Sequence, residues 1–186
     1  MEIKTLVTVF VSVLGVIGGF IAIYQFAQDR RSKRGFTWRD VDKLVLELLD
    51  KIRYDQFDPD LVLGVGRGGS VMAGMLAGNL GHLPLVCIDT ESRRDRGQTY
   101  CVIRFPNAVP PLRDRRVLIV VGELWTGEDL RTAMKFVKRR KANEFKTLSL
   151  LSHPAAAVRP DFIGRETKTP LTAPWRLTDD YKKTRI

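Results

Sequence analysis

The stretch 60-DLVLGVGRGGSVMAGMLAGNL-80 decides the fold of this 186-residue chain. Its apolar run at 61–65 has the length and composition of a strand that is buried on both faces. Gly-Arg-Gly-Gly at 66–69 interrupts the run, and the small residues that follow predict a helix over 70–80 that packs close to a sheet. A buried strand, a glycine turn and a helix in this order predict an α/β unit with parallel strands.

The rest of the domain repeats this alternation. Thr37 and Asp40 form a variant of the capping box and predict a helix, whose core face at helical spacing is Val41, Leu44, Val45, Leu48, Leu49 and Ile52. Strands are predicted at 85–88, 100–105, 117–121 and 147–151. A helix is predicted after Gly127, with Leu130, Ala133, Met134 and Val137 on one face. The residues from His153 onward are proline-rich and predicted to be irregular.

These elements predict a doubly wound, mostly parallel sheet with flanking helices. In such sheets, ligands bind at the carboxyl ends of the strands. Two glycine-containing segments, 66–69 and 122–127, follow predicted strands and therefore fall at that edge.

A different kind of segment precedes this domain. Residues 6–27 carry no charge, and at about 1.5 Å per residue they are long enough to span a hydrocarbon core of about 30 Å. The alternative is a cleaved signal peptide, which usually has a shorter apolar core and a small-residue cleavage site. We expect a transmembrane anchor at 1–28, followed by a basic linker at 29–36.

Charge predicts the orientation of this anchor. The formal net charge is +10, and four basic residues follow the apolar segment, whereas only Lys4 precedes it. The positive-inside rule then predicts a single-pass protein with its N-terminus outside and its C-terminal domain in the cytoplasm. Gly15 and Gly19 have the GxxxG spacing that lets two membrane helices pair, and the domain itself is a second route to a homo-oligomer. No nucleic-acid-binding motif with interleaved aromatic residues is present.

The two cysteines agree with a cytosolic domain. Cys87 and Cys101 lie in apolar stretches without CxxC spacing, which predicts reduced, buried thiols.

Three stretches resemble the type I phosphoribosyltransferases, especially their xanthine and hypoxanthine branch. They are FDPDLVLGVGRGGSVMAGMLAGNLGHLPLVCID at 57–89, RRVLIVVGELWTGEDL at 115–130 and PDFIGRETKTPLTAPW at 160–175. The resemblance implies a phosphoribosyltransferase-like domain at 37–178, followed by a C-terminal tail at 179–186. It also implies a reaction in which a nucleobase nitrogen displaces pyrophosphate from C1 of phosphoribosyl diphosphate, with Mg²⁺ if the protein is active.

The resemblance also assigns roles to residues. Those implied to bind pyrophosphate are Arg67, Gly68 and Gly69. Those implied to bind the 5′-phosphate are Thr126 and Gly127. The base pocket would include His153 and Trp175, and a mobile loop that closes on pyrophosphate would carry Arg93, Arg94 and Arg96.

The chain departs from the family pattern after the strand at 117–121. Family members place two adjacent acids where this chain has Val121 and Gly122. Glu123, the candidate catalytic residue, follows one position later, and no metal ligand is predicted from protein side chains. Glu128 and Asp129 next to the predicted phosphate site would repel a phosphate.

The base pocket departs as well, because His153 replaces a lysine and Pro170 a stacking tryptophan. Two functions remain open. One is a membrane-anchored phosphoribosyltransferase-family protein that binds phosphoribosyl diphosphate or a nucleotide-like ligand, with transfer weakened by the divergent loops. The other is a catalytically inactive sensor, regulator or defence-system subunit that acts by binding a ligand or protein at the membrane.

Overall fold

The computed structural model describes residues 36–95, 98–104 and 106–176. The chain divides into two compact units, Met1–Phe36 and Thr37–Ile186, and the fold described below belongs to the second. The predicted anchor at 6–27 lies outside the described residues. Among the described helices, none is long and apolar enough to cross a membrane.

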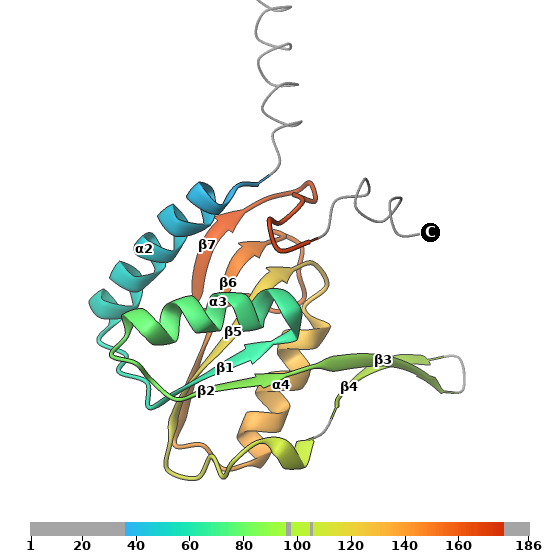
Figure 1. Ribbon diagram of the computed structural model, residues 1–186. Helices are drawn as coiled ribbons and strands as arrows, with labels where there is room; N and C mark the ends of the chain where they lie inside the picture. The colour runs from blue at the N-terminus through green and yellow to red at the C-terminus, as the bar shows by residue number, and fades with distance from the viewer. Residues whose placement is uncertain (1–35, 96–97, 105, 177–186) are drawn as a thin grey trace, which may run out of the picture. The chain divides into compact units, whose positions relative to one another are not determined.

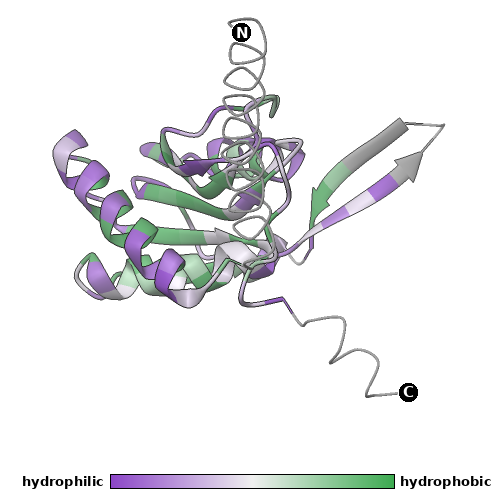
Figure 2. Cartoon of the chain, turned by 90° about the horizontal axis from the view of Figure 1, so that it is seen from above, coloured by the Kyte–Doolittle hydropathy of each residue, from purple (hydrophilic) through white to green (hydrophobic). Residues whose placement is uncertain are grey.

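Five parallel strands form the central sheet, in the order β2-β1-β5-β6-β7 (Figure 1). Their bounds are β1 (Leu61–Val65), β2 (Leu85–Ile88), β5 (Arg116–Leu124), β6 (Glu144–Ser152) and β7 (Phe162–Glu166). Every residue of β1 is buried, as expected for a central strand that is covered on both faces. Figure 2 shows the resulting band of hydrophobic strands between helices with polar outer surfaces.

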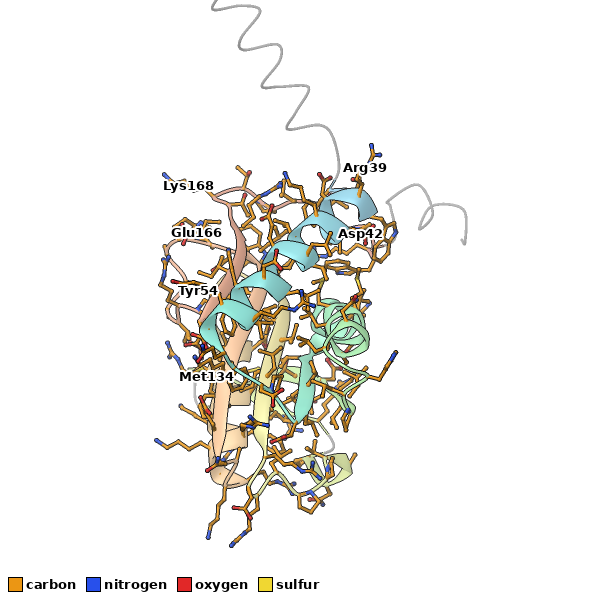
Figure 3. All side chains as sticks on the ribbon, turned by 90° about the vertical axis from the view of Figure 1, so that its left-hand side faces the viewer. Arg39, Asp42, Tyr54, Met134, Glu166 and Lys168 are labelled. Carbon is orange, nitrogen blue, oxygen red and sulfur yellow. The ribbon has the colours of Figure 1, made fainter. Side chains whose placement is uncertain are left out.

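Helices cover both faces of the sheet. Helices α2 (Trp38–Asp55) and α3 (Gly66–Asn79) pack on one face, and α4 (Glu128–Arg139) packs on the other (Figure 1). The predicted capping box is confirmed, because Thr37 N–H donates to Asp40 at 2.9 Å and Asp40 N–H donates back to Thr37 Oγ1 at 3.3 Å. All six predicted core residues of α2 are buried, and Figure 3 shows Arg39, Asp42 and Tyr54 on its outer side.

A two-stranded antiparallel hairpin leaves the edge of this body (Figure 1). It consists of β3 (Thr90–Asp95) and β4 (Gln98–Ile103), and a short 3-10 helix, η1 (Pro106–Ala108), follows it. The predicted strand at 100–105 corresponds to β4. Strand β3 was not predicted, because its sequence TESRRD is polar and has no apolar alternation.

Three further sequence predictions need correction. The segment Gly-Arg-Gly-Gly is the first turn of α3, not a loop before it. Strand β5 extends into the predicted glycine segment as far as Leu124, because β6 continues to pair with it there. The region after His153, predicted to be irregular, contributes β7, which pairs with β6.

The predicted burial of the cysteines is also wrong in part. Both thiols are free, but Cys87 is exposed and Cys101 is only partly buried. Cys87 lies in β2, an edge strand of the described sheet.

Buried and half-buried polar contacts align the starts of the strands at the amino edge of the sheet. Asp60 accepts hydrogen bonds from the backbone N–H of Arg116 at 2.8 Å and from its guanidinium at 3.0 Å. These bonds lower the pKa of Asp60. Asp161 likewise accepts from the backbone N–H of Thr147 at 2.7 Å. The first contact ties the start of β1 to β5, and the second ties the start of β7 to β6.

Candidate functional site

The turn that follows β1 presents groups that suit an anion. Gly66 has a φ of +65°, a conformation that glycine adopts without strain, and Ser70 Oγ closes the turn by donating to its carbonyl at 2.8 Å. Helix α3 has no side-chain cap and no acidic residue in its first turn. Arg67 is exposed, and its side chain makes no ion pair with another described residue. Free first-turn N–H groups and a guanidinium are the groups that bind phosphate.

The same turn lies against β5, at the place where the family pattern has its acids. A Cβ on Gly122 would stand 2.7 Å from the carbonyl carbon of Gly68, and one on Gly69 would stand 2.5 Å from the carbonyl oxygen of Val120. Only glycines allow two backbones to approach this closely. Val121 is 3% exposed and packs in the core beneath α4. Neither of the two acid positions therefore presents a side chain at this edge.

Glu123, the candidate catalytic residue, is already engaged. Its side chain is 7% exposed and forms an ion pair with Arg176 at 3.0 Å. The same oxygen, Oε2, accepts a hydrogen bond from Trp125 Nε1 at 3.3 Å. In this structure Glu123 therefore joins the end of β5 to the chain near residue 176.

The two residues predicted for the base pocket have different neighbours. His153 packs beside Trp125, with ring centroids 5.6 Å apart, and its backbone N–H donates to the carbonyl of Leu124 at 2.8 Å. Trp175 instead lies against the turn at 66–69, because a Cβ on Gly68 would be 3.1 Å from its Nε1. Sequence reasoning did not single out Trp125, although it directly precedes the predicted phosphate-binding pair Thr126 and Gly127.

Thr126 and Gly127 lie at the start of α4, as predicted. Gly127 is the N-cap with a φ of +90°, and a Cβ there would be 3.1 Å from the backbone nitrogen of Val158. Thr126 is exposed, and its carbonyl accepts a hydrogen bond from Ala157 N–H at 3.0 Å. Residues 157 and 158, in the chain after β6, therefore pack against this turn.

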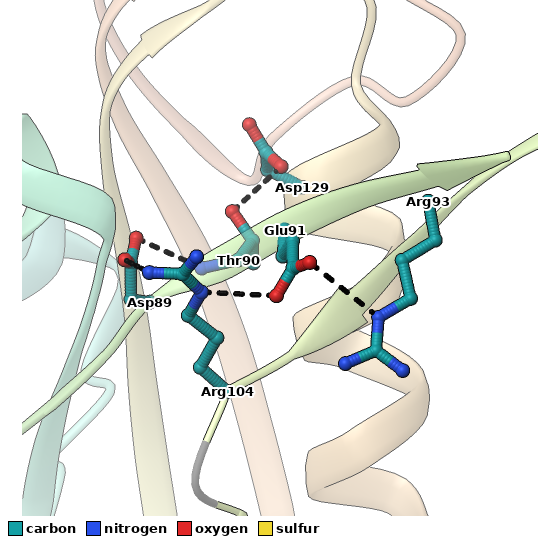
Figure 4. A network of polar contacts seen from close by, with 6 residues as sticks. All are labelled: Asp89, Thr90, Glu91, Arg93, Arg104 and Asp129. Carbon is teal, nitrogen blue, oxygen red and sulfur yellow. Dashed lines mark hydrogen bonds and ion pairs between the residues drawn. The ribbon is translucent and has the colours of Figure 1, made fainter.

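The two carboxylates that follow have partners of their own. Asp129 Oδ1 accepts from Thr90 Oγ1 at 2.8 Å (Figure 4) and from Cys101 Sγ at 3.1 Å. Glu128 pairs with Arg131 at 3.1 Å. Burial and then the bond to Asp129 raise the pKa of Cys101, so its thiol stays protonated and donates. Hydrogen bonds and an ion pair therefore orient both carboxylates in this structure.

Two of the three arginines predicted for a mobile loop lie in the hairpin. Arg93 and Arg94 lie in β3, and Arg96 is outside the described residues. Arg93 pairs with Glu91 at 3.6 Å, and Arg104 contacts the same carboxylate at 3.0 Å (Figure 4). The hydrogen bond from Arg104, and then the charge of Arg93, lower the pKa of Glu91. Arg93 is thus part of an ion-pair network at the base of the hairpin.

The two family acid positions offer no side chain that could hold Mg²⁺. Val121 and Gly122 offer no side-chain oxygen, whereas Mg²⁺ is bound by oxygen ligands. In the described part of the chain, no three His, Cys, Asp or Glu residues are grouped closely enough to hold a metal ion.

Comparisons with known proteins show which proteins this domain resembles. The family model for the phosphoribosyl transferase domain matches residues 37–182. A purine phosphoribosyltransferase from Pyrococcus horikoshii is 32% identical, with a TM-score of 0.66, and the match covers 76% of this chain and 92% of that one. No curated protein sequence matches the chain significantly.

Two more distant structures show the fold alone. A hypothetical protein from Neisseria gonorrhoeae, solved with bound ppGpp, is 21% identical with a TM-score of 0.68, and the match covers 81% of this chain and 93% of that one. A hypoxanthine phosphoribosyltransferase from Staphylococcus aureus is 20% identical with a TM-score of 0.60, and the match covers 76% and 80%.

Proposed function

This chain belongs to the phosphoribosyl transferase domain family, and we propose that it binds a ribose ligand bearing a diphosphate at the carboxyl edge of its sheet. The ligand class includes phosphoribosyl diphosphate and nucleotides. The observation that carries the proposal is the turn at 66–69, where an exposed Arg67 without an ion-pair partner among the described residues stands beside the uncapped first turn of α3.

Each part of this edge has a task in binding. Arg67 pairs with diphosphate oxygens, and the first-turn N–H groups of α3 donate to them. Thr126 and the N-terminus of α4 receive the second phosphate, that of the ribose 5′ position. Asp129 is held by Thr90 and Cys101, so its carboxylate does not compete for this space.

We propose that this protein retains ligand binding, whereas its transferase activity is weakened or lost. Group transfer needs the ribose to be oriented as well as held, since orientation accounts for a large share of the rate. The family acids that hold the ribose hydroxyls are replaced by the buried Val121 and by Gly122, which has no room for a side chain. The competing function, an active transferase, requires Glu123 to leave Arg176 and take over this task.

Isothermal titration calorimetry of the full-length chain tests the proposal, with phosphoribosyl diphosphate, pyrophosphate and ppGpp as ligands. Mg²⁺ is included because the family uses it with phosphoribosyl diphosphate. In Arg67→Ala we expect a loss of about 1.5–3 kcal/mol from a charge-assisted contact, which is a 10- to 100-fold weaker affinity. Arg113→Ala is the matched control, because Arg113 is exposed in the loop before β5, at the opposite edge.

Equal affinities of Arg67→Ala and the unchanged chain would contradict the proposed site. A nucleobase-transfer assay on the same samples separates the two functions. Tight binding without transfer supports a binding protein. Turnover that Glu123→Gln abolishes supports the transferase.

We also propose that residues 6–27 anchor this domain to a membrane with the domain on the cytoplasmic side. The support is the uncharged length of the segment and the basic residues Arg30, Arg31, Lys33 and Arg34 that follow it. The chain should stay in the membrane fraction after carbonate extraction at high pH. Protease added to intact cells should leave the domain uncut. Release by carbonate would contradict the anchor.

A further inference from the structure

Residues 173–176 form a short segment, here called the C-terminal strap, beside the anion-binding turn. Ala173 is fully buried, and Arg176 N–H donates to its carbonyl at 3.0 Å, which closes a turn around residue 175. Arg176 is tied to Glu123 at the end of β5 by an ion pair of 3.0 Å. The strap is therefore held at two points and presents Trp175 between them.

Trp175 joins two parts of the domain that are distant in sequence. On one side its ring faces Gly68, so that a Cβ there would be 3.1 Å from Nε1 and 3.3 Å from Cε2. On the other side its ring meets that of Trp38, with centroids 6.2 Å apart and planes tilted by 59°. Trp38 is the first residue of α2 and is 49% exposed. The start of the domain thus contacts the anion-binding turn through one side chain.

Gly68 lies between a rigid neighbour and a movable one. On the rigid side is Gly122 of β5, a central strand that pairs with β1 and β6. On the movable side is the ring of Trp175, on a strap whose ion-pairing arginine side chain is 58% exposed. Local opening begins where buried contacts are fewest. An anion that shifts the turn is therefore expected to displace the ring of Trp175 rather than β5.

We propose that the C-terminal strap transmits occupancy of the anion-binding turn to Trp38, the point at which the N-terminal unit of the chain joins the domain. The coupling rests on the proposed function, because it needs an anion to bind at residues 66–69. It adds a consequence of binding that does not need group transfer: the junction between the two units reports whether the turn is filled.

Fluorine NMR tests this coupling, because the chain has three tryptophans. The full-length chain is labelled with 5-fluorotryptophan, and Trp38→Phe and Trp125→Phe assign the three resonances, with Trp175 identified by elimination. Pyrophosphate with Mg²⁺ is the titrant, and calorimetry is run on the same sample. We expect the Trp175 and Trp38 resonances to shift at the same midpoint concentration of pyrophosphate, equal to that measured by calorimetry. In Arg67→Ala we expect this concentration to rise 10-fold or more.

The outcomes separate this inference from the proposed function. If calorimetry detects binding but the Trp175 resonance does not shift, the coupling through the C-terminal strap is refuted, and the proposed function is unaffected. A shift of Trp175 without a shift of Trp38 overturns the transmission to the junction. The absence of any heat with pyrophosphate, phosphoribosyl diphosphate and ppGpp overturns the proposed function, and the inference with it.

Discussion

The ends of β1 and β5 lie side by side at one edge of the sheet, yet they offer a ligand different groups. After β1 the chain presents an exposed arginine and a helix start with neither cap nor acid. The last residues of β5 include a glycine without room for a side chain and a buried glutamate in an ion pair, and the helix that follows starts with two acids. The first end keeps the groups that hold a phosphate, whereas the second lacks those that would orient a ribose.

The difference teaches that the two ends are not independent. The turn after β1 sits so close to β5 that Gly122 must remain a glycine. An acid at this position, as in the family pattern, would therefore disturb the turn at 66–69, where we propose that a phosphate binds. The proposed phosphate-binding turn and an acid that would orient the ribose therefore cannot both occupy the space between Gly68 and Gly122.

The largest effect is expected for Gly122→Asp, which tries to make the second end resemble the family. Its Cβ would meet the backbone of Gly68, and a carboxylate would be buried there. We expect the free energy of unfolding to fall by about 3 kcal/mol, because overpacking and charge burial add together. Urea unfolding measures it.

Gly78→Ala is the control for this substitution. Gly78 is exposed in α3 and has open space around its Cβ position, so alanine should stabilise the helix by about 0.5–1 kcal/mol. A stable Gly122→Asp protein that gains nucleobase transfer would show that the two ends do not compete.

A smaller effect is expected at the amino edge of the sheet, which sets where both strands begin. Asp60→Asn removes the carboxylate that Arg116 holds, at a cost of about 1 kcal/mol at neutral pH. Because the folded-state pKa of Asp60 is lowered, this stabilisation is present above the unfolded pKa of about 3.9 and is lost as the pH falls through the folded value.

Unfolding of Asp60→Asn and of the unchanged chain should therefore differ at pH 7 and converge at the acid end. Asp58→Asn serves as the control, since Asp58 also contacts Arg116 but its side chain is 81% exposed. A difference between Asp60→Asn and the unchanged chain that persists undiminished below the folded pKa would refute the assignment.

The smallest effect is expected for Thr90→Val, which removes one hydrogen bond to Asp129 beside the proposed 5′-phosphate site. The released carboxylate should repel the ligand, and affinity for phosphoribosyl diphosphate should fall about threefold, within the range of exposed charge interactions. Thr132→Val is matched, since Thr132 contacts Cys101 but not Asp129. Unchanged calorimetric affinity in Thr90→Val would mean that Asp129 does not face the ligand.

The sequence by itself determined the local units of this protein. The capping box at Thr37, the core face of α2 and the strand followed by a helix around Arg67 come from local patterns and are present, although the helix begins four residues earlier than predicted. Hydrophobic periodicity predicts the helix face and the strand directly, because it shows which face of one element is buried. Strands β3 and β7 were missed because their sequences, TESRRD and FIGRE, carry little of that signal.

Only the tertiary structure decided how the candidate site is assembled. Asp129 meets Thr90 across 39 positions, and Glu123 meets Arg176 across 53. Trp175 lies on Gly68 rather than beside His153 because a strap returns from the far end of the domain. Such partners depend on how β5 and its neighbours stack, and no local pattern specifies which side chains then share the edge of a sheet.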